Sequence, residues 1–298
     1  MRIINAHVHM VELEKMLALD PELEINLDLP VFSNLAQTMS LLDPESLIAQ
    51  MDEAGIEKTV LFACEAPVIY SSNEYVAGLC KAYPQRFIGF ASVNPKRKDA
   101  AVVIEKAILQ LGLKGVKFHP PLQNFYPNDK NIFSLYKKIE ELNVPVVFHI
   151  GTTPFGSMVK LDQANPILID EVACNFPNLR IMLTHLGTLW QNEAFMVTEK
   201  NANVYIDTSA YLYEIRQLMT EDLVTRVGLN KFIFGTDYPM PFGDSTHRMK
   251  DFVDCINNLD LPPEAKEMIF SKNFESFMKP KVKPALKAKD LLGKFKIA

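Results

Sequence analysis

The amino-acid sequence predicts an α/β fold, a single (β/α)₈ TIM barrel within a chain of 298 residues. Three observations support this prediction: eight short apolar runs, a spacing of about 30 residues between most of them, and amphipathic stretches in the intervals. Strands and helices that alternate in this way can close into a barrel without an exposed sheet edge. The predicted strands cover residues 2–9, 57–65, 86–93, 115–120, 144–151, 179–186, 203–209 and 231–237.

The clearest predicted helix covers residues 44–54. Asp43 can cap its N-terminus, Pro44 suits the first helical position, and Gly55 suits the left-handed exit. The apolar residues between them share one helical face, as expected for a helix that packs on a sheet. The same reasoning predicts two further helices, over residues 99–111 and 131–142.

Two segments do not fit the repeat. The first interval between strands is too long, and we interpret residues 10–42 as an insertion that acts as a lid or specificity loop over the mouth of the barrel. Residues 279–298 form a lysine-rich C-terminal tail, in which Pro280 and Pro284 oppose an early helix. The barrel domain should therefore cover residues 1–278, and the tail is either a solvated basic segment or an arm that packs on a partner subunit.

Composition excludes several classes of protein. Hydrophobic residues make up 48% of the chain and charged residues 22%, which is typical of a folded globular protein. A formal net charge of −5 argues against nucleic acid as a partner, and no apolar stretch is long enough to span a membrane. The N-terminus has no signal-like segment, so we expect a cytoplasmic protein that acts on a small molecule.

The histidines are the main clue to function. The sequence has six, and five of them fall at the C-terminal ends of predicted strands: His7, His9, His119, His149 and His185. A barrel brings these strand ends together at one mouth, so residues that are distant in the sequence should meet in a single pocket.

This pattern predicts a metal site. His7 and His9 are two residues apart on one strand and should face the same way, which lets both imidazoles reach one ion. A nitrogen of His149 and an oxygen of Asp237 would complete a set of three histidines and one aspartate. Zn²⁺ is the first choice for such ligands, while Mn²⁺ or Fe²⁺ is also possible.

Other residues have two open interpretations each. His119 either contacts the substrate or a metal ligand, or is a core histidine. Trp190 either forms a wall of the substrate pocket or packs in the following helix. Lys117 is either a modified lysine that bridges two metals or part of a simple buried ion pair, and the ion pair with a single metal is the default. His247 is expected at the surface.

Five segments together resemble the amidohydrolase-related family, metal-dependent TIM-barrel hydrolases and decarboxylases that include aminocarboxymuconate semialdehyde decarboxylase and γ-resorcylate decarboxylase. The segments are NAHVH (5–9), GVKFHP (115–120), FHIG (148–151), THLG (184–187) and GTDYP (235–239). The resemblance implies that His7, His9, His149 and Asp237 bind the metal, that His185 is catalytic, and that a homodimer is possible. Asn5 stands where the family usually has an acidic residue, so this position offers an amide in place of a carboxylate.

We predict hydrolysis of a small carbonyl, ester, lactone or amide substrate as the first function. A metal-bound water would attack, Asp237 would accept its proton, and His185 would polarise the carbonyl. The alternative is non-oxidative decarboxylation of a small aromatic or unsaturated carboxylic acid at the same site, with Asp237 or His185 as the proton donor. Arg216 or Arg248 could then orient the carboxylate. A third hypothesis is an inactive scaffold, against which the intact ligand set argues.

Overall fold

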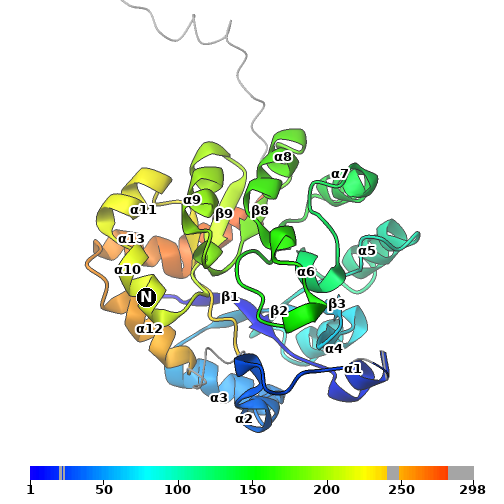
Figure 1. Cartoon of the computed structure of the whole chain (residues 1–298). Coiled ribbons are helices and arrows are strands. Elements are labelled where there is room, and N and C mark those ends of the chain that lie inside the picture. The colour runs from blue at the N-terminus through cyan, green and yellow to red at the C-terminus, as the bar shows by residue number, and fades with distance from the viewer. Residues whose placement is uncertain (20–21, 23, 240–247, 281–298) are drawn as a thin grey trace, which may run out of the picture.

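The structure is a computed structural model that describes residues 1–19, 22, 24–239 and 248–280. Within these residues, parallel strands form a ring that helices surround (Figure 1). Each predicted apolar run contains one strand of the ring, so the TIM barrel is confirmed. The strands are β1 (Ile4–His9), β2 (Lys58–Phe62), β5 (Phe87–Phe90), β6 (Val116–Phe118), β7 (Val146–Phe148), β8 (Ile181–Leu183), β9 (Val204–Asp207) and β10 (Phe232–Ile233).

The ring closes through two short contacts between its halves. Strands β1, β2 and β5 form one continuous sheet, and β6 to β10 form the other. The backbone N–H of Lys117 donates to the carbonyl of Ala91 at 2.7 Å, and that of Ala6 donates to the carbonyl of Phe234 at 2.8 Å. Isolated parallel bridges accompany both contacts, so no long sheet edge is left open.

The outer helices follow the strands largely as predicted. Asp43 accepts a hydrogen bond from the Ser46 N–H at 2.7 Å, and Gly55 leaves the helix with a φ of 68°. Asp99 does not cap its helix, because its carboxylate pairs with Arg97 instead. The helices are α3 (Pro44–Ala54), α4 (Asn73–Ala82), α5 (Ala100–Leu109), α7 (Phe133–Glu141), α8 (Ile167–Asn175), α9 (Gln191–Lys200), α10 (Leu212–Leu218), α11 (Glu221–Val227), α12 (Met249–Asn257), α13 (Pro263–Glu267) and α14 (Asn273–Met278).

Shorter elements surround the C-terminal ends of the strands. The predicted strand over 57–65 is in fact broken, because β2 is followed by an antiparallel hairpin. The described part of the insertion contains two short helices and a 3₁₀ turn. These elements are β3 (Cys64–Ala66), β4 (Ile69–Ser71), α1 (Leu13–Leu19), the 3₁₀ turn Pro30–Phe32, α2 (Leu35–Met39) and α6 (Pro120–Gln123). Of the predicted tail, residues 281–298 lie outside the described residues, as does His247.

A β-bulge in β1 decides where its histidines point. Asn5 pairs with Thr59 and Val8 with Leu61, so two residues of β1 stand opposite one residue of β2. The extra residue reverses the alternation, since side chains normally point to opposite faces in turn. Ala6, before the shift, packs with the apolar residues that fill the barrel, and His7 and His9 lie side by side after it.

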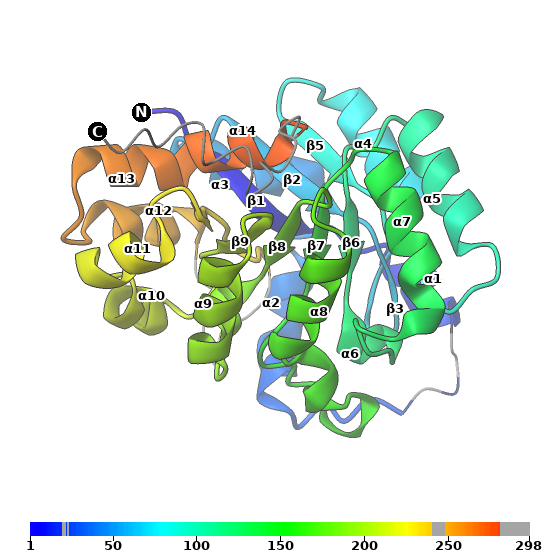
Figure 2. The ribbon, with the colours of Figure 1, turned by 90° about the horizontal axis from the view of Figure 1, so that it is seen from above.

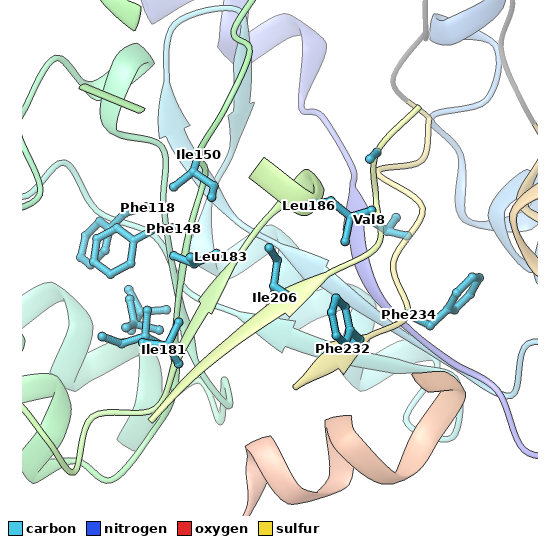
Figure 3. Close-up of a cluster of buried hydrophobic side chains, with 14 of the residues drawn as sticks. Val8, Phe118, Phe148, Ile150, Ile181, Leu183, Leu186, Ile206, Phe232 and Phe234 are labelled. Atoms are coloured by element: carbon cyan, nitrogen blue, oxygen red, sulfur yellow. The ribbon is translucent and has the colours of Figure 1, made fainter. Parts of the chain in front are cut away.

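Two layers of the hydrophobic core belong to the barrel itself. The larger one lies between the strands and the helices and includes Phe118, Phe148, Leu183, Ile206 and Phe232 (Figure 3). The smaller one fills the barrel and is closed by Phe274 and Phe277 of α14. That helix packs across the end at which the strands begin (Figure 2), where the guanidinium of Arg180 donates to the carbonyl of Met278. The histidines lie at the opposite end of the barrel, where the strands end. None of the helices in the described part of the chain is both long and apolar enough to cross a bilayer.

Candidate active site

A cavity lies at the C-terminal ends of the strands, and its empty space is about 610 Å³ when open solvent is included. Its polar side carries His9, His119, His149, His185 and Asp237. His7 lies directly beneath and is fully buried. The apolar side includes Val31 from the insertion, together with Ile69 and Phe155. The five histidines and the aspartate that the sequence placed at strand ends therefore do meet, and the insertion does border the mouth.

Three of these residues form a compact group. Nε2 of His7 lies 3.2 Å from Nε2 of His9 and 3.0 Å from Oδ1 of Asp237, and His9 Nε2 lies 3.4 Å from the same oxygen. Asp237 is held here because its backbone N–H donates to the carbonyl of His7. Burial acts to raise the pKa of the Asp237 carboxyl, but its interactions with His7 and His185 outweigh this and keep the pKa below its usual range.

The arrangement fits a metal ion. The pKa of His9 is lowered well below its usual value, chiefly by burial, so this imidazole is neutral. The two Nε2 atoms and the Asp237 oxygen face one another. Their separations are close to the distance between two ligand atoms around a tetrahedral zinc, which is about 3.4 Å. Electron-pair donors that converge in this way form a group that could hold a metal ion. Nδ1 of His9 also has no hydrogen-bond partner among the described residues.

Asp207, at the end of β9, fixes the orientation of His7. Its Oδ2 accepts from Nδ1 of His7 at 2.7 Å, while Oδ1 accepts from the backbone N–H groups of His185 and Ser209. Burial would raise the pKa of Asp207, yet the nearby His7 and the hydrogen bonds lower it to about 2. An ionised carboxylate can accept hydrogen bonds but cannot donate them, so the proton of His7 is on Nδ1. The lone pair of Nε2 then points at the proposed metal position.

His185 belongs to a second set of imidazoles. Its Nδ1 donates to the carbonyl of Ser209 at 2.7 Å, which leaves Nε2 to accept from Nδ1 of His149 at 3.1 Å. Nε2 of His149 then accepts from the hydroxyl of Thr153 at 2.9 Å. The ring of His119 stacks on that of His149, with their centres 3.9 Å apart. Burial lowers the pKa of His185 to about 4, so this imidazole is neutral near pH 7.

Lys117 is the one charged side chain of β6 and is fully buried. Its Nζ lies 3.4 Å from Nε2 of His7 and 4.7 Å from the centre of the Phe62 ring. Burial lowers its pKa to about 8, although the carboxylates of Asp237 and Asp207 oppose this. No carboxylate of the described residues forms an ion pair with this Nζ, so the predicted buried ion pair is not formed, and the two carboxylates act on Lys117 only from a longer distance.

Three residues considered from the sequence lie away from the cavity. Trp190 is half-buried just before α9 and is not among the described residues that line the cavity. Arg248 is exposed and pairs with Glu53, and Arg216 is exposed beside Cys255. Neither arginine is in place to orient a substrate carboxylate. Asn5 is buried and donates to Thr236 at 2.9 Å, so it supports β1 from behind the histidines.

Sequence reasoning missed Asp207 and Ser209. Both lie within the predicted strand over 203–209, at the same end as the histidines. The rule that located the histidines would also have located Asp207, had it been applied to carboxylates. Thr152, Thr153 and Phe155 were missed because they lie in the loop after β7, which carries no periodic signal.

Comparisons with known proteins agree with this geometry. The sequence model described as Amidohydrolase matches residues 4–275. The chain belongs to the amidohydrolase family. Its similarity to individual relatives is low. It is 24% identical over 206 residues to the 2-amino-3-carboxymuconate-6-semialdehyde decarboxylase of Dictyostelium discoideum, a match that covers 58% of this chain and 56% of that protein. It is 23% identical to the γ-resorcylate decarboxylase of Rhodococcus jostii over 262 residues, 67% of this chain and 78% of the relative.

A solved structure supports the fold of this amidohydrolase. The 5-carboxyvanillate decarboxylase of Novosphingobium aromaticivorans, solved with bound manganese and a nitrobenzoic acid, has a TM-score of 0.73 and 19% identity. The match covers 93% of this chain and 97% of that one. At this level of identity the similarity shows the shared barrel.

Asp207→Asn tests the role assigned to Asp207. The backbone N–H groups of His185 and Ser209 should keep the asparagine oxygen, so its NH₂ group would face Nδ1 of His7. Because this NH₂ group can only donate, the imidazole should turn its proton toward the metal position. We expect metal affinity to fall by about 10- to 100-fold, measured by competition with a chelating dye. Asn203→Asp is the control, because Asn203 holds backbone carbonyls at the other end of β9. Equal losses in both variants would mean that Asp207 acts only on stability.

Proposed function

We propose that this protein is a metal-dependent decarboxylase that removes CO₂, without oxidation, from a small aromatic or unsaturated carboxylic acid. The observation that carries the proposal is the group of His7, His9 and Asp237 beside the neutral pair His149 and His185, all at one cavity. The decarboxylases among the relatives favour this reaction over the hydrolysis that the sequence first suggested.

The ligands that we propose are His7, His9, Asp237 and His149. The first three converge in the structure. The hydrogen bonds of His149 leave its Nε2 with a lone pair, as a ligand requires, although that nitrogen faces Thr153 here. A bound divalent ion would supply positive charge to hold the substrate carboxylate and a neighbouring oxygen. Zinc is our first proposal because of the nitrogen-rich donor set, and manganese is the first alternative.

The charge distribution of the cavity leaves the metal as the partner of a substrate carboxylate. No lysine or arginine is among the described residues that line it, and Asp237 is its one described carboxylate. An acid therefore has no side-chain cation to bind there, and the metal is the natural partner for it. The remaining polar groups are neutral imidazoles and hydroxyls, which can move protons without repelling an anion.

The reaction requires residues of the chain to transfer one proton to the substrate. When the bond to the carboxylate carbon breaks, CO₂ leaves without the bonding electrons, and the remaining carbon must take up a proton. At rest Asp237 is ionised, and the proton of neutral His185 is held by the Ser209 carbonyl. His185 or Asp237 therefore first takes a proton from solvent and then passes it to that carbon from the polar side of the cavity. The stacked ring of His119 limits the movement of His149 and closes that side of the cavity.

Product analysis tests this function. Protein loaded with Zn²⁺ or Mn²⁺ is incubated in D₂O with hydroxybenzoic acids and unsaturated carboxylic acids whose carboxyl carbon is ¹³C. We expect labelled CO₂ and an equal amount of product with deuterium at the carbon that lost it. Esters, lactones and amides are assayed in parallel. Turnover of one of these without any CO₂ from the acids would overturn the proposal in favour of hydrolysis.

A further inference from the structure

A second cavity, whose empty space is about 490 Å³ when open solvent is included, adjoins the histidine-lined one. The two share His9, Val31, Ile69 and Phe155 as lining residues. We call the second cavity the side chamber. Most of its other walls come from the insertion after β1, including Phe32, Thr38, Met39 and Leu42.

The walls of the side chamber are almost wholly apolar. Apart from His9 and Thr38, its described lining residues are valine, isoleucine, leucine, methionine, phenylalanine and proline. None of them carries a charge. Water gains little from such walls, whereas apolar carbon that enters the chamber leaves water and is stabilised.

Unpaired polar atoms mark both cavities. Buried polar atoms without a hydrogen-bond partner are rare in folded proteins. Among the described residues, three such atoms are Oγ1 of Thr38, Oγ1 of Thr152 and Nδ1 of His9. Thr38 lines the side chamber, Thr152 lines the histidine cavity, and His9 lines both. A bound ligand would provide the missing partners.

We infer that the substrate carries an apolar arm that fills the side chamber. Its carboxylate end would lie among the histidines, and an arm of a few carbons would extend past Val31 and Ile69. A hydroxyl or ether oxygen on the arm would pair with the hydroxyl of Thr38. This inference rests on the proposed function for the carboxylate end, and it assigns the insertion a role in selecting substrates.

Binding of a graded series of acids tests the inference. The metal-loaded full chain is titrated by calorimetry with 2-hydroxybenzoic acid and with derivatives that carry methyl, propyl or 3-hydroxypropyl groups at each ring position. At one position we expect affinity to rise about fourfold per buried methylene, so on the order of 50-fold for propyl. Equal affinity for all the acids, or a loss with the longer arms at every position, would overturn the inference.

Two variants locate the arm. Met39→Glu places a charge in the side chamber and should remove most of the gain from the propyl group. Its control is Leu27→Gln, because Leu27 lies in the same insertion but is 63% exposed, and this variant should keep the gain. Thr38→Val should weaken binding of the hydroxypropyl acid about tenfold relative to the propyl acid. If the propyl group still increases the affinity of the Met39→Glu variant, the arm binds outside the side chamber.

The same acids in the ¹³CO₂ assay separate this inference from the proposed function. A gain in affinity that depends on the arm, without CO₂ release, would support the side chamber and refute decarboxylation. CO₂ release without a gain in affinity from the arm would support decarboxylation and refute the role of the side chamber. If no acid binds the metal-loaded protein, both are wrong.

Discussion

His9→Gln should remove most of the bound metal and reduce turnover to background. Nε2 of His9 is one of three atoms that converge at the proposed metal position. Zinc sites in proteins bind with about 10 to 16 kcal/mol, which is roughly 3 to 4 kcal/mol for each of four ligands. The loss of one ligand should therefore weaken binding by on the order of several hundredfold. Elemental analysis of the purified variant and a competition assay with a chelating dye measure the loss.

The matched control is His119→Gln, which changes another cavity histidine that is stacked on His149 and outside the three-residue group. It should keep its metal. Full metal content in His9→Gln, or equal loss in both variants, would contradict the assignment. His149→Ala extends the series, because a loss of metal like that of His9→Gln would support His149 as the fourth ligand.

His185→Gln should leave the metal in place and slow the reaction. Its Nε2 lies 3.1 Å from His149 and outside the group formed by His7, His9 and Asp237. If His185 carries the proton to carbon, its loss should lower kcat by about 10²- to 10⁴-fold. KM and the affinity for a nonreacting acid should change by only a few fold. The measurement is steady-state ¹³CO₂ release together with metal content.

Two results would contradict this role. Normal kcat would mean that another group, such as Asp237, supplies the proton. Loss of metal together with activity would mean that His185 acts as a ligand or holds the ligand set together through Asp207, whose Oδ1 it shares with Ser209. The comparison of metal content with kcat separates these roles.

The sequence predicted the fold and the residues at the strand ends because both follow from short-range regularities. Apolar runs mark the buried strands, and His7, His9 and Asp237 fall where those runs end. A closed parallel barrel then brings the ends together whatever the loops do. The prediction of a shared pocket needed no knowledge of side-chain contacts.

The remaining features depend on geometry that the sequence does not carry. The bulge in β1 is visible only in the pairing of Asn5 and Val8 with their partners on β2. The tautomer of His7 follows from its contact with Asp207, which is 200 residues away in the sequence. Trp190 shows the limit of reasoning by position, since it follows a strand-end histidine closely and still does not line the cavity.

X-ray diffraction from crystals of the native protein, recorded at the zinc and manganese absorption edges, tests the central claim most directly. We predict one anomalous peak, about 2.0 to 2.3 Å from Nε2 of His7, Nε2 of His9 and a carboxylate oxygen of Asp237. The account would be contradicted by crystals with no peak at this position at either edge, or by an ion held at a site that none of these three residues reaches.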